Sequence, residues 1–478
     1  MPVGEELKIL AVGNPFQFLG GGHRRTYEVL KHYSELGADV TLYIPLSQLI
    51  ATRALQIFFH ISEEDLYRNL DNLEKCGVRI HENMLACLEK TGKQVIKQLN
   101  ALRKGGVLWI INNFRKLIPL SNKEIIISVK TFLDDMKMST KTMSEIHAVY
   151  VMDNHLDMIQ AGRFISQSIK VPLFILLQSI PIGSLKNFII NEWIYNVSLS
   201  GKSSLRTLFR IIIRTLEQSY LKHKTLFTYN DASKTLAALF SVSEAPLKLS
   251  SLDTWAFNRG IPAQVLIPGN AVGQDIERYY RKREKILQEK ENYAIFYARL
   301  GISKGILEIP FIAKKLEKAG YKLILVGKFE STDVKTRFER ICRRLCIKNI
   351  EYMGYLPDEK LWETIAKSKV LVYPSHDDTF SLVVLESLFL GASIVAYNIP
   401  AIVSIYKNLP VVKIVEEYNY KSMAEEAIKI LKMDIEKFVE EHENENLTKF
   451  LELHSSWKNV ARAEIQLMCN IMKMKNRI

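Results

Sequence analysis

The sequence predicts an α/β protein with two doubly wound domains, each built on a parallel sheet. Three observations support this fold class. The chain has 478 residues, which is too long for one ordinary hydrophobic core. Short apolar runs alternate with helix-like segments in both halves of the chain. These runs are rich in Val and Ile and are bounded by turn residues, as is typical of buried parallel strands.

The predicted strands fall into two series. In the first half they are residues 8–14, 39–45, 148–154, 172–179 and 225–230. In the second half they are residues 294–300, 322–328, 350–356, 369–375, 393–398 and 411–416. We therefore expect an N-terminal domain over residues 1–222 and a C-terminal domain over residues 223–457, facing each other across a cleft.

The composition limits the classes of partner. The chain has 65 Lys and Arg residues against 52 Asp and Glu residues, a formal net charge of +13. Such a charge favours anionic partners such as nucleotides, phosphates or an acidic membrane surface. No motif supports nucleic-acid binding. Five scattered cysteines without a CxxC pair indicate a reduced, cytoplasmic chain, and we expect neither a signal peptide nor a membrane span.

Two basic segments are relevant to binding at an acidic membrane surface. One lies within residues 103–123, and in the other Arg206, Arg210 and Arg214 recur at every fourth position. Residues four apart share one face of a helix, and a basic amphipathic helix can lie on an anionic bilayer. The same spacing also fits the solvated face of an ordinary packed helix, so both interpretations stay open.

A glycine-rich loop follows the first predicted strand. Gly20, Gly21 and Gly22 stand directly before a predicted helix. Glycines let backbone N–H groups approach a ligand closely, and the N-terminus of a helix favours an anion. The spacing matches neither the dinucleotide-binding fingerprint nor a P-loop. A purely structural turn is therefore the alternative to a phosphate-binding loop.

Two cations follow the first strand of the second half. Arg299 and Lys304 lie in the stretch YARLGISKGILEIP, where that strand ends. In open α/β sheets, ligands bind at the carboxyl ends of the strands, and two cations at that position suit a diphosphate. The alternative is a pair of ordinary surface cations.

A carboxylate interrupts the apolar helix predicted in PSHDDTFSLVVLESLFLG, residues 374–391. The helix begins near residues 379–381, where its first backbone N–H groups lack intrahelical partners. Glu386 lies about two turns further on, among apolar residues. A buried carboxylate without a partner costs several kcal/mol. We expect a buried cation, a ligand with hydroxyl donors such as a ribose, or a position on a partly exposed stripe.

These features together resemble the retaining glycosyltransferases of the GT-B fold, in particular glycosyltransferase family 4. The hallmark of that family is a pair of acids separated by seven residues, here Asp378 and Glu386. Thr379 and Ser381 depart from it, because the family prefers Gly at those positions. Further similar stretches are ARLGISKG, LVGKF, MGYLP, IPGNAV and HSSW. The resemblance implies two Rossmann-like domains, with a final helix at about residues 458–478 that crosses back to the N-terminal domain.

The resemblance also implies roles on the donor side. Glu386 would bind the ribose hydroxyls, and Arg299 and Lys304 would neutralise the departing diphosphate. Asp378 would contact the donor sugar. The remaining donor-side residues are Thr379, Phe380 and Ser381, whose backbone amides would contact phosphate, together with Gly327 and Gly354 at neighbouring strand ends. The loop Gly20–Gly22 would close over the diphosphate and shape the acceptor site.

The acceptor side departs from the family pattern. Gln178 stands where the family often has a histidine, and a glutamine can hydrogen-bond a sugar but cannot act as a base. His155 lies near the end of the preceding strand. It is either a second candidate for acceptor-side chemistry or a plain loop histidine.

The function implied by the resemblance is that of a hexosyltransferase-type enzyme. It would move a sugar from a nucleoside-diphosphate-sugar to an acceptor hydroxyl with retention at the anomeric carbon. We expect no metal or other cofactor, because the two cations would take its place. The protein would be cytoplasmic or peripheral on the inner face of the membrane, where the acceptor could be lipid-linked. The alternatives are a nucleotide-sugar epimerase or other GT-B enzyme, and a basic membrane-binding protein with a degenerate GT-B fold.

Overall fold

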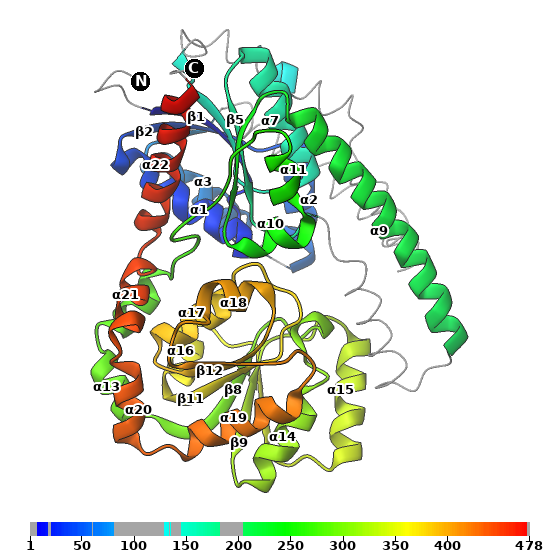
Figure 1. Ribbon diagram of the computed structural model, residues 1–478, viewed down its shortest axis with the longest axis vertical. Coiled ribbons are helices and arrows are strands. Elements are labelled where there is room, and N and C mark those ends of the chain that lie inside the picture. The colour runs from blue at the N-terminus through cyan, green and yellow to red at the C-terminus, as the bar shows by residue number, and fades with distance from the viewer. Residues whose placement is uncertain are drawn as a thin grey trace.

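The protein has two lobes, each with a parallel sheet at its centre (Figure 1). The computed structural model describes residues 7–17, 21–59, 61–80, 129–132, 134, 145–181 and 204–475. Gly20 and the basic segment 103–123 lie outside these residues. The predicted pair of parallel sheets is confirmed.

The first sheet has the strand order β3-β2-β1-β4-β5-β6-β7, and all its neighbouring strands run parallel. Its strands are β1 (Leu7–Val12), β2 (Ala38–Tyr43), β3 (Val78–Ile80), β4 (Ala148–Val151), β5 (Leu173–Leu177), β6 (Leu236–Ser241) and β7 (Ala263–Val265). Ile9 and Ala11 belong to one apolar core, and Leu10 and Val12 belong to another. Both faces of the sheet are therefore buried, which explains the unbroken apolar runs.

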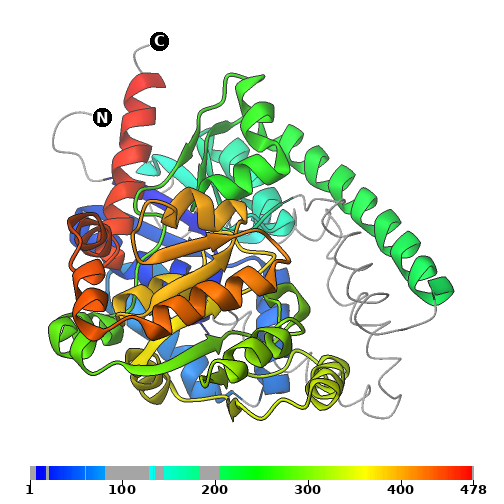
Figure 2. The ribbon, with the colours of Figure 1, turned by 60° about the horizontal axis from the view of Figure 1, so that its bottom comes forward.

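Helices connect these strands. They are α1 (Gly21–Tyr33), α2 (Leu46–Phe59), α3 (Glu63–Lys75), α7 (Leu156–Ile169), α9 (Ser204–Ala232), α10 (Glu244–Ser250) and α11 (Leu252–Phe257). The start of α10 shows the local chemistry of a helix N-terminus, because Ser243 Oγ accepts a hydrogen bond from the backbone N–H of Ala245. Helix α9 is much longer than its neighbours and leaves the body of its lobe (Figures 1 and 2).

The second sheet has the order β10-β9-β8-β11-β12-β13 and is also parallel throughout. Its strands are β8 (Glu291–Tyr297), β9 (Lys322–Val326), β10 (Ile350–Gly354), β11 (Ser368–Tyr373), β12 (Ser393–Tyr397) and β13 (Val412–Val415). Its helices are α12 (Gln274–Tyr280), α13 (Arg283–Gln288), α14 (Ile309–Lys318), α15 (Thr332–Leu345), α16 (Asp358–Lys367), α17 (Leu382–Phe389), α18 (Pro400–Tyr406), α19 (Tyr420–Lys432), α20 (Ile435–His442) and α21 (Glu445–Leu453). A short 3-10 turn, η5 (Ile302–Lys304), follows β8.

Two predictions from the sequence are wrong. Residues 225–230 do not form a strand but lie inside α9, where Thr225, Thr228 and Tyr229 are buried at the three- and four-residue spacing of a helix. The domain boundary at 222/223 is also wrong, because β6 and β7 hydrogen-bond within the first sheet. The boundary lies after β7, between Val265 and Gln274.

The expected crossing helix is confirmed. Helix α22 (Trp457–Lys475) packs along α1 of the first lobe (Figures 1 and 2). Arg25 Nη2 on α1 lies 2.6 Å from Glu464 Oε1 on α22, and both side chains are fully buried. The hydroxyl of Tyr33 donates to the other carboxylate oxygen of Glu464. The end of the chain is thereby tied to the first lobe.

Candidate active site

Polar residues gather where each sheet reverses its strand order. In the first sheet the reversal lies between β1 and β4, and in the second it lies between β8 and β11. Ligands of open α/β sheets bind at the carboxyl ends of the strands at such points. Lys304 follows β8 and Asp378 follows β11, so both predicted residues flank the reversal in the second sheet.

Lys304 and Asp378 form the centre of this edge. Lys304 Nζ lies 3.0 Å from Asp378 Oδ2 and donates to the carbonyl of Asp377 at 2.8 Å. The hydroxyl of Tyr373 donates to the same oxygen of Asp378. Burial opposes the charge on Lys304, but Tyr373 and Asp378 outweigh it and hold the lysine pKa above its usual value. A fixed positive charge therefore stands at the strand ends.

Arg299 is placed less tightly than Lys304. It is exposed, and its charge acts on the nearby Asp377 carboxylate. Gly327 directly follows β9, and a Cβ at this position would lie 2.0 Å from the carbonyl oxygen of Ala298. Only glycine fits such a close backbone approach. Gly354 ends β10 with a φ of +69°, so both predicted glycines lie at the same edge of the sheet as Lys304.

The turn before α17 has the conformation for which glycine is favoured. Ser381 has a φ of 65°, in the left-handed region, and its hydroxyl accepts a bond from Val384 N–H at 3.4 Å. The hydroxyl of Tyr406 donates to the carbonyls of Phe380 and Ser381. In the described part of the chain, the N–H groups of Thr379, Phe380 and Ser381 donate to no protein acceptor. They remain available to an anion.

Glu386 has its charged partner in the other lobe. Its Oε1 lies 3.7 Å from Nη1 of Arg24 on α1, and its Oε2 lies 3.5 Å from the Tyr297 hydroxyl. Glu386 is only 7% exposed. Burial raises the pKa of its carboxyl group to about 7, while Arg24 acts to lower it. Both contacts are too long for strong hydrogen bonds, so the carboxylate can still accept hydrogens from a ligand.

The buried side chain of His376 supports the loop before α17. His376 Nε2 lies 2.6 Å from Glu308 Oε1, and its Nδ1 lies 2.7 Å from Glu417 Oε1. Burial acts to lower the His376 pKa, but the bonds to the two carboxylates outweigh it and raise the pKa. Its backbone N–H donates to Ser303 O. This histidine therefore joins the Asp378 loop to the turn that carries Lys304.

The glycine loop of the first lobe faces the second lobe. Gly21 and Gly22 form the start of α1. A Cβ on Gly21 would lie 3.5 Å from Cδ1 of Leu382, the first residue of α17. A Cβ on Gly22 would lie 3.0 Å from the side-chain oxygen of Gln178. Small residues here allow α1, β5 and α17 to meet.

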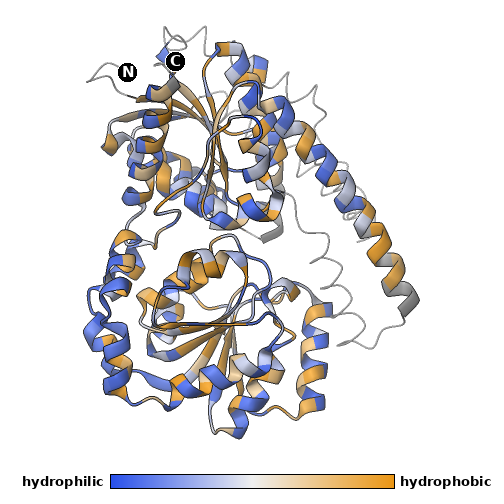
Figure 3. Ribbon diagram, in the orientation of Figure 1, coloured by the Kyte–Doolittle hydropathy of each residue, from blue (hydrophilic) through white to orange (hydrophobic). Residues whose placement is uncertain are grey.

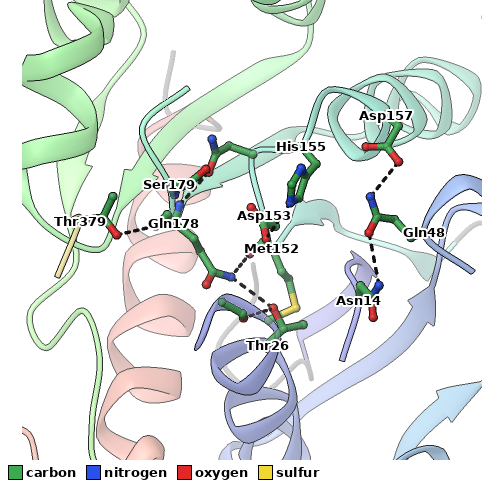
Figure 4. A network of polar contacts seen from close by, with 12 residues as sticks. Asn14, Thr26, Gln48, Met152, Asp153, His155, Asp157, Gln178, Ser179 and Thr379 are labelled. Carbon is green, nitrogen blue, oxygen red and sulfur yellow. Dashed lines mark hydrogen bonds and ion pairs between the residues drawn. The ribbon is translucent and has the colours of Figure 1, made fainter. Parts of the chain in front are cut away.

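Gln178 joins the two lobes at this point (Figure 4). Its side-chain nitrogen donates to Thr26 Oγ1 at 3.2 Å and to Met152 O at 2.5 Å. Its backbone carbonyl accepts a bond from Thr379 Oγ1 at 2.8 Å. The Gln178 side chain is thus held by the first lobe, while its backbone contacts the predicted donor side.

Asp153 is a candidate that the sequence analysis missed (Figure 4). It follows β4 at the reversal of the first sheet and is 6% exposed, yet its Oδ1 has no hydrogen-bond partner among the described residues. A buried carboxylate oxygen without a partner is costly, which makes Asp153 a candidate to accept a hydrogen bond from a ligand. His155, by contrast, has a side chain that is 53% exposed, with Nε2 3.8 Å from Asp153 Oδ2. The position of Asp153 directly after a buried strand was the available signal.

No metal site is evident in the part of the chain that the structure describes. There, no group of three or more His, Cys, Asp or Glu side chains could hold a metal ion.

Sequence relatives match mainly the second lobe. Residues 278–447 match the family model described as glycosyl transferases group 1. Over 134 residues the chain is 27% identical to an uncharacterized glycosyltransferase of Methanocaldococcus jannaschii, covering 28% of this chain and 34% of that protein. Over 115 residues it is 27% identical to the O-antigen chain mannosyltransferase B of Escherichia coli, covering 23% of this chain and 30% of that protein. The matches thus span about a third of these relatives.

Solved structures match the whole chain. A glycosyltransferase from Rickettsia africae aligns over 98% of this chain and 99% of its own, with a TM-score of 0.60 and 14% identity. The sucrose-phosphate synthase of Thermosynechococcus elongatus aligns over 98% and 100%, with a TM-score of 0.58 and 12% identity. Anabaena HepE, crystallised with UDP and glucose, aligns over 97% and 99%, with a TM-score of 0.56 and 12% identity. The chain therefore carries a glycosyl transferases group 1 domain over residues 278–447, in a molecule with the GT-B fold.

Proposed function

We propose that the protein is a glycosyltransferase that moves a hexosyl group from a nucleoside-diphosphate-sugar to an acceptor hydroxyl, with retention at the anomeric carbon. One observation carries this proposal. Lys304, Asp378 and Glu386 gather at the strand reversal of the second sheet, opposite the N-terminus of α1. The names of two similar proteins agree with it, since HepE was crystallised with UDP and glucose and the E. coli relative is a mannosyltransferase.

On the donor side, each group would meet one part of the nucleotide-sugar. The ribose hydroxyls would donate to Glu386, whose present contacts are long. Lys304, Arg299 and the free amides of residues 379–381 would meet the diphosphate. As the bond from the anomeric carbon to the diphosphate oxygen breaks, its electron pair stays on the diphosphate. Preorganised cations and amides stabilise the charge that grows there.

The acceptor side would be formed by the first lobe. Asp153 Oδ1 would accept a hydrogen bond from the incoming hydroxyl, and Gln178 would hold Thr379 of the donor side in place. Asp153 is better suited to this role than the exposed His155, because its buried oxygen lacks a partner among the described residues. As the oxygen of the acceptor forms the new bond to the anomeric carbon, its proton would pass to Asp153 Oδ1.

The proposal includes no metal, because Lys304 and Arg299 would stabilise the leaving diphosphate. Treatment with EDTA should therefore leave the rate of sugar transfer unchanged. Loss of transfer on chelation, with recovery on adding Mg²⁺ or Mn²⁺, would contradict this part.

We also propose that the acceptor is carried by an anionic membrane. The net charge of +13 supports this proposal. In the described ranges, no helix is long and apolar enough to cross a bilayer. Residues 206, 210 and 214 do lie in a helix, α9, but their side chains fall outside the described part.

Donor binding can be tested without knowing the acceptor. A thermal-shift screen of nucleoside diphosphates and their sugars should identify the base, because a ligand of the folded state raises the melting temperature. Glu386→Ala should weaken binding of that nucleotide about tenfold to a hundredfold, since hydrogen bonds to a charged group are lost. The exposed carboxylate Glu363 on α16 offers a control, and Glu363→Ala should bind normally. Unchanged binding in Glu386→Ala would contradict the donor site.

The rate of sugar transfer tests the roles of Lys304 and Asp153 separately from the role of Glu386 in donor binding. Lys304→Ala should lower the rate of sugar transfer about a hundredfold or more with a smaller loss of donor binding. Asp153→Asn should keep donor binding and lower transfer. Full transfer in both variants would exclude the assigned roles.

A further inference from the structure

Helix α9 exposes large apolar side chains along one face. Phe209, Ile213, Leu216, Tyr220 and Phe227, which we call the α9 ridge, are 66%, 42%, 65%, 67% and 63% exposed. Their spacing of four, three, four and seven residues places them on one face of the helix. Single exposed apolar side chains are common on protein surfaces, but a row of this length marks an interaction surface.

The opposite face of α9 is firmly packed. Ile211 and Tyr229 are buried there, and α9 packs against α7. Arg163 Nη1 on α7 lies 2.8 Å from Asp231 Oδ2 on α9. The C-terminal part of the helix is therefore anchored on α7, while the side chains of the α9 ridge are exposed. Figures 1 and 2 show that its N-terminal part leaves the body of the lobe, and Figure 3 shows apolar residues along that part.

The charge around the ridge indicates what it binds. From residue 204 to 224 the sequence has three arginines and two lysines against a single acid, Glu217. Lys224 lies beside the ridge on the helix surface and is exposed. A second copy of the chain would bring the same positive charge to this face and be repelled. An anionic bilayer would both attract the cations and take up the apolar row.

We propose that α9 docks the protein in the plane of an anionic membrane surface, with the α9 ridge inserted among the lipids. The proposal rests on the membrane part of the proposed function and names the surface responsible. Helix α7, on which α9 packs, begins immediately after His155. Docking through α9 thereby holds the proposed acceptor edge of the first sheet at a fixed place relative to the lipid surface.

Vesicle sedimentation tests the ridge directly. The wild-type protein is mixed with phosphatidylcholine vesicles, with and without phosphatidylglycerol, and no nucleotide is added. We expect binding to the anionic vesicles only, weakened by high salt. The triple variant Phe209→Ser, Leu216→Ser and Tyr220→Ser should bind about tenfold or more weakly. Because these side chains are exposed, its circular dichroism and melting temperature should match the wild type.

Matched controls distinguish binding through the ridge from nonspecific binding through any exposed apolar side chain. Tyr355, in the second lobe, is 76% exposed, and Tyr355→Ser should leave vesicle binding unchanged. Lys224→Gln, beside the ridge, should lower binding to anionic vesicles at low salt. Wild-type binding by the triple variant would overturn the proposal, as would equal binding to neutral vesicles. If analytical ultracentrifugation shows that the wild type is a dimer and the triple variant a monomer, the ridge is instead a self-association surface.

The outcome is independent of the donor site. Nucleotide binding, measured by thermal shift without vesicles, should be the same in the wild type and the triple variant. Vesicle binding without any nucleotide binding would remove the proposed glycosyltransferase function and leave the docking surface. Nucleotide binding without vesicle binding would remove the docking surface and leave the proposed glycosyltransferase function.

Discussion

The burial of Glu386 lowers stability, and its long contacts leave room for the proposed ligand. It is buried among apolar neighbours, and its nearest cation, Arg24, is 3.7 Å away in the other lobe. A shorter ion pair would satisfy the carboxylate but would leave less capacity for a ligand. The pKa of Glu386 is raised to about 7 because burial leaves its charged form poorly solvated.

This pKa predicts how the stability of the protein depends on pH. Between the unfolded value of 4.5 and about 7, the folded protein keeps a proton on Glu386 that the unfolded chain has lost. The contribution of Glu386 to the free energy of unfolding is therefore present below about pH 4.5 and is lost as the pH rises through 7. At about 1.4 kcal/mol per pKa unit, the loss is about 3 kcal/mol.

Glu386→Gln should remove this dependence. Relative to the wild type, the free energy of unfolding of the variant should rise by up to about 3 kcal/mol between about pH 5 and 8. Urea denaturation across that range measures the difference. Glu363→Gln, at an exposed carboxylate, is the control for the loss of a surface charge. A difference between Glu386→Gln and the wild type that does not change with pH would contradict the raised pKa of Glu386.

At the scale of elements, the turn between β8 and α14 sets the position of Lys304. Gly305, which follows Lys304, has a φ of +75°, and a Cβ there would lie 2.1 Å from the carbonyl oxygen of Pro374. Pro374 directly follows β11, so the turn and the Asp378 loop touch through their backbones. This close approach brings Lys304 Nζ within 3.0 Å of Asp378.

Gly305→Ala should push these two segments apart. Gly320 is the matched control, because it has a φ of +84° but open space around it. Gly320→Ala should lower the free energy of unfolding by about 1 kcal/mol, the cost of the left-handed conformation alone. Gly305→Ala should cost about 3 kcal/mol or more and should also weaken nucleotide binding. Equal costs in urea denaturation would mean that the contact with Pro374 does not constrain the turn.

For the whole molecule, the crossing helix α22 is the main tie between the end of the chain and the first lobe. Glu464 on α22 is fully buried and bonds to Arg25 and Tyr33 on α1. Arg25 also donates through Nε to the carbonyl of Gly269, where the chain passes from the first lobe to the second. One buried guanidinium thus connects α1, α22 and the segment between the lobes.

Glu464→Gln should loosen this connection, because it leaves the buried Arg25 without a counter-charge. The expected loss is about 3 kcal/mol in the free energy of unfolding, with faster proteolysis near the start of α22. Glu35 and Lys458 form an exposed pair, at 2.9 Å, between the same two regions. Glu35→Gln should cost less than about 1 kcal/mol. Similar losses of the free energy of unfolding in Glu464→Gln and Glu35→Gln would show that the buried pair contributes no more to stability than the exposed pair.

Much of the donor side could be predicted from the sequence. Parallel strands bring their carboxyl ends to one edge, so residues that follow apolar runs come together. Lys304 and Asp378 do meet at this edge, and Gly327 and Gly354 lie along it. Their roles in binding a nucleotide-sugar remain predictions. The strand predicted at 225–230 was wrong because its apolar and aromatic residues suit a strand as well as a helix, and packing on α7 decided between them.

The sequence by itself determined that there are two parallel sheets, most of their strands and the polar residues at those strand ends, because these depend on short-range pattern and on the geometry of parallel strands. It did not predict β3, β6 and β7 of the first sheet. Only the tertiary structure decided the partners. Arg24 reaches Glu386 across 362 positions of the chain, and α9 shows an apolar face to the outside. Asp153 Oδ1 is left buried without a hydrogen-bond partner among the described residues. These contacts depend on how the lobes and helices pack, and no local pattern of residues encodes the distance between two groups so far apart in the chain.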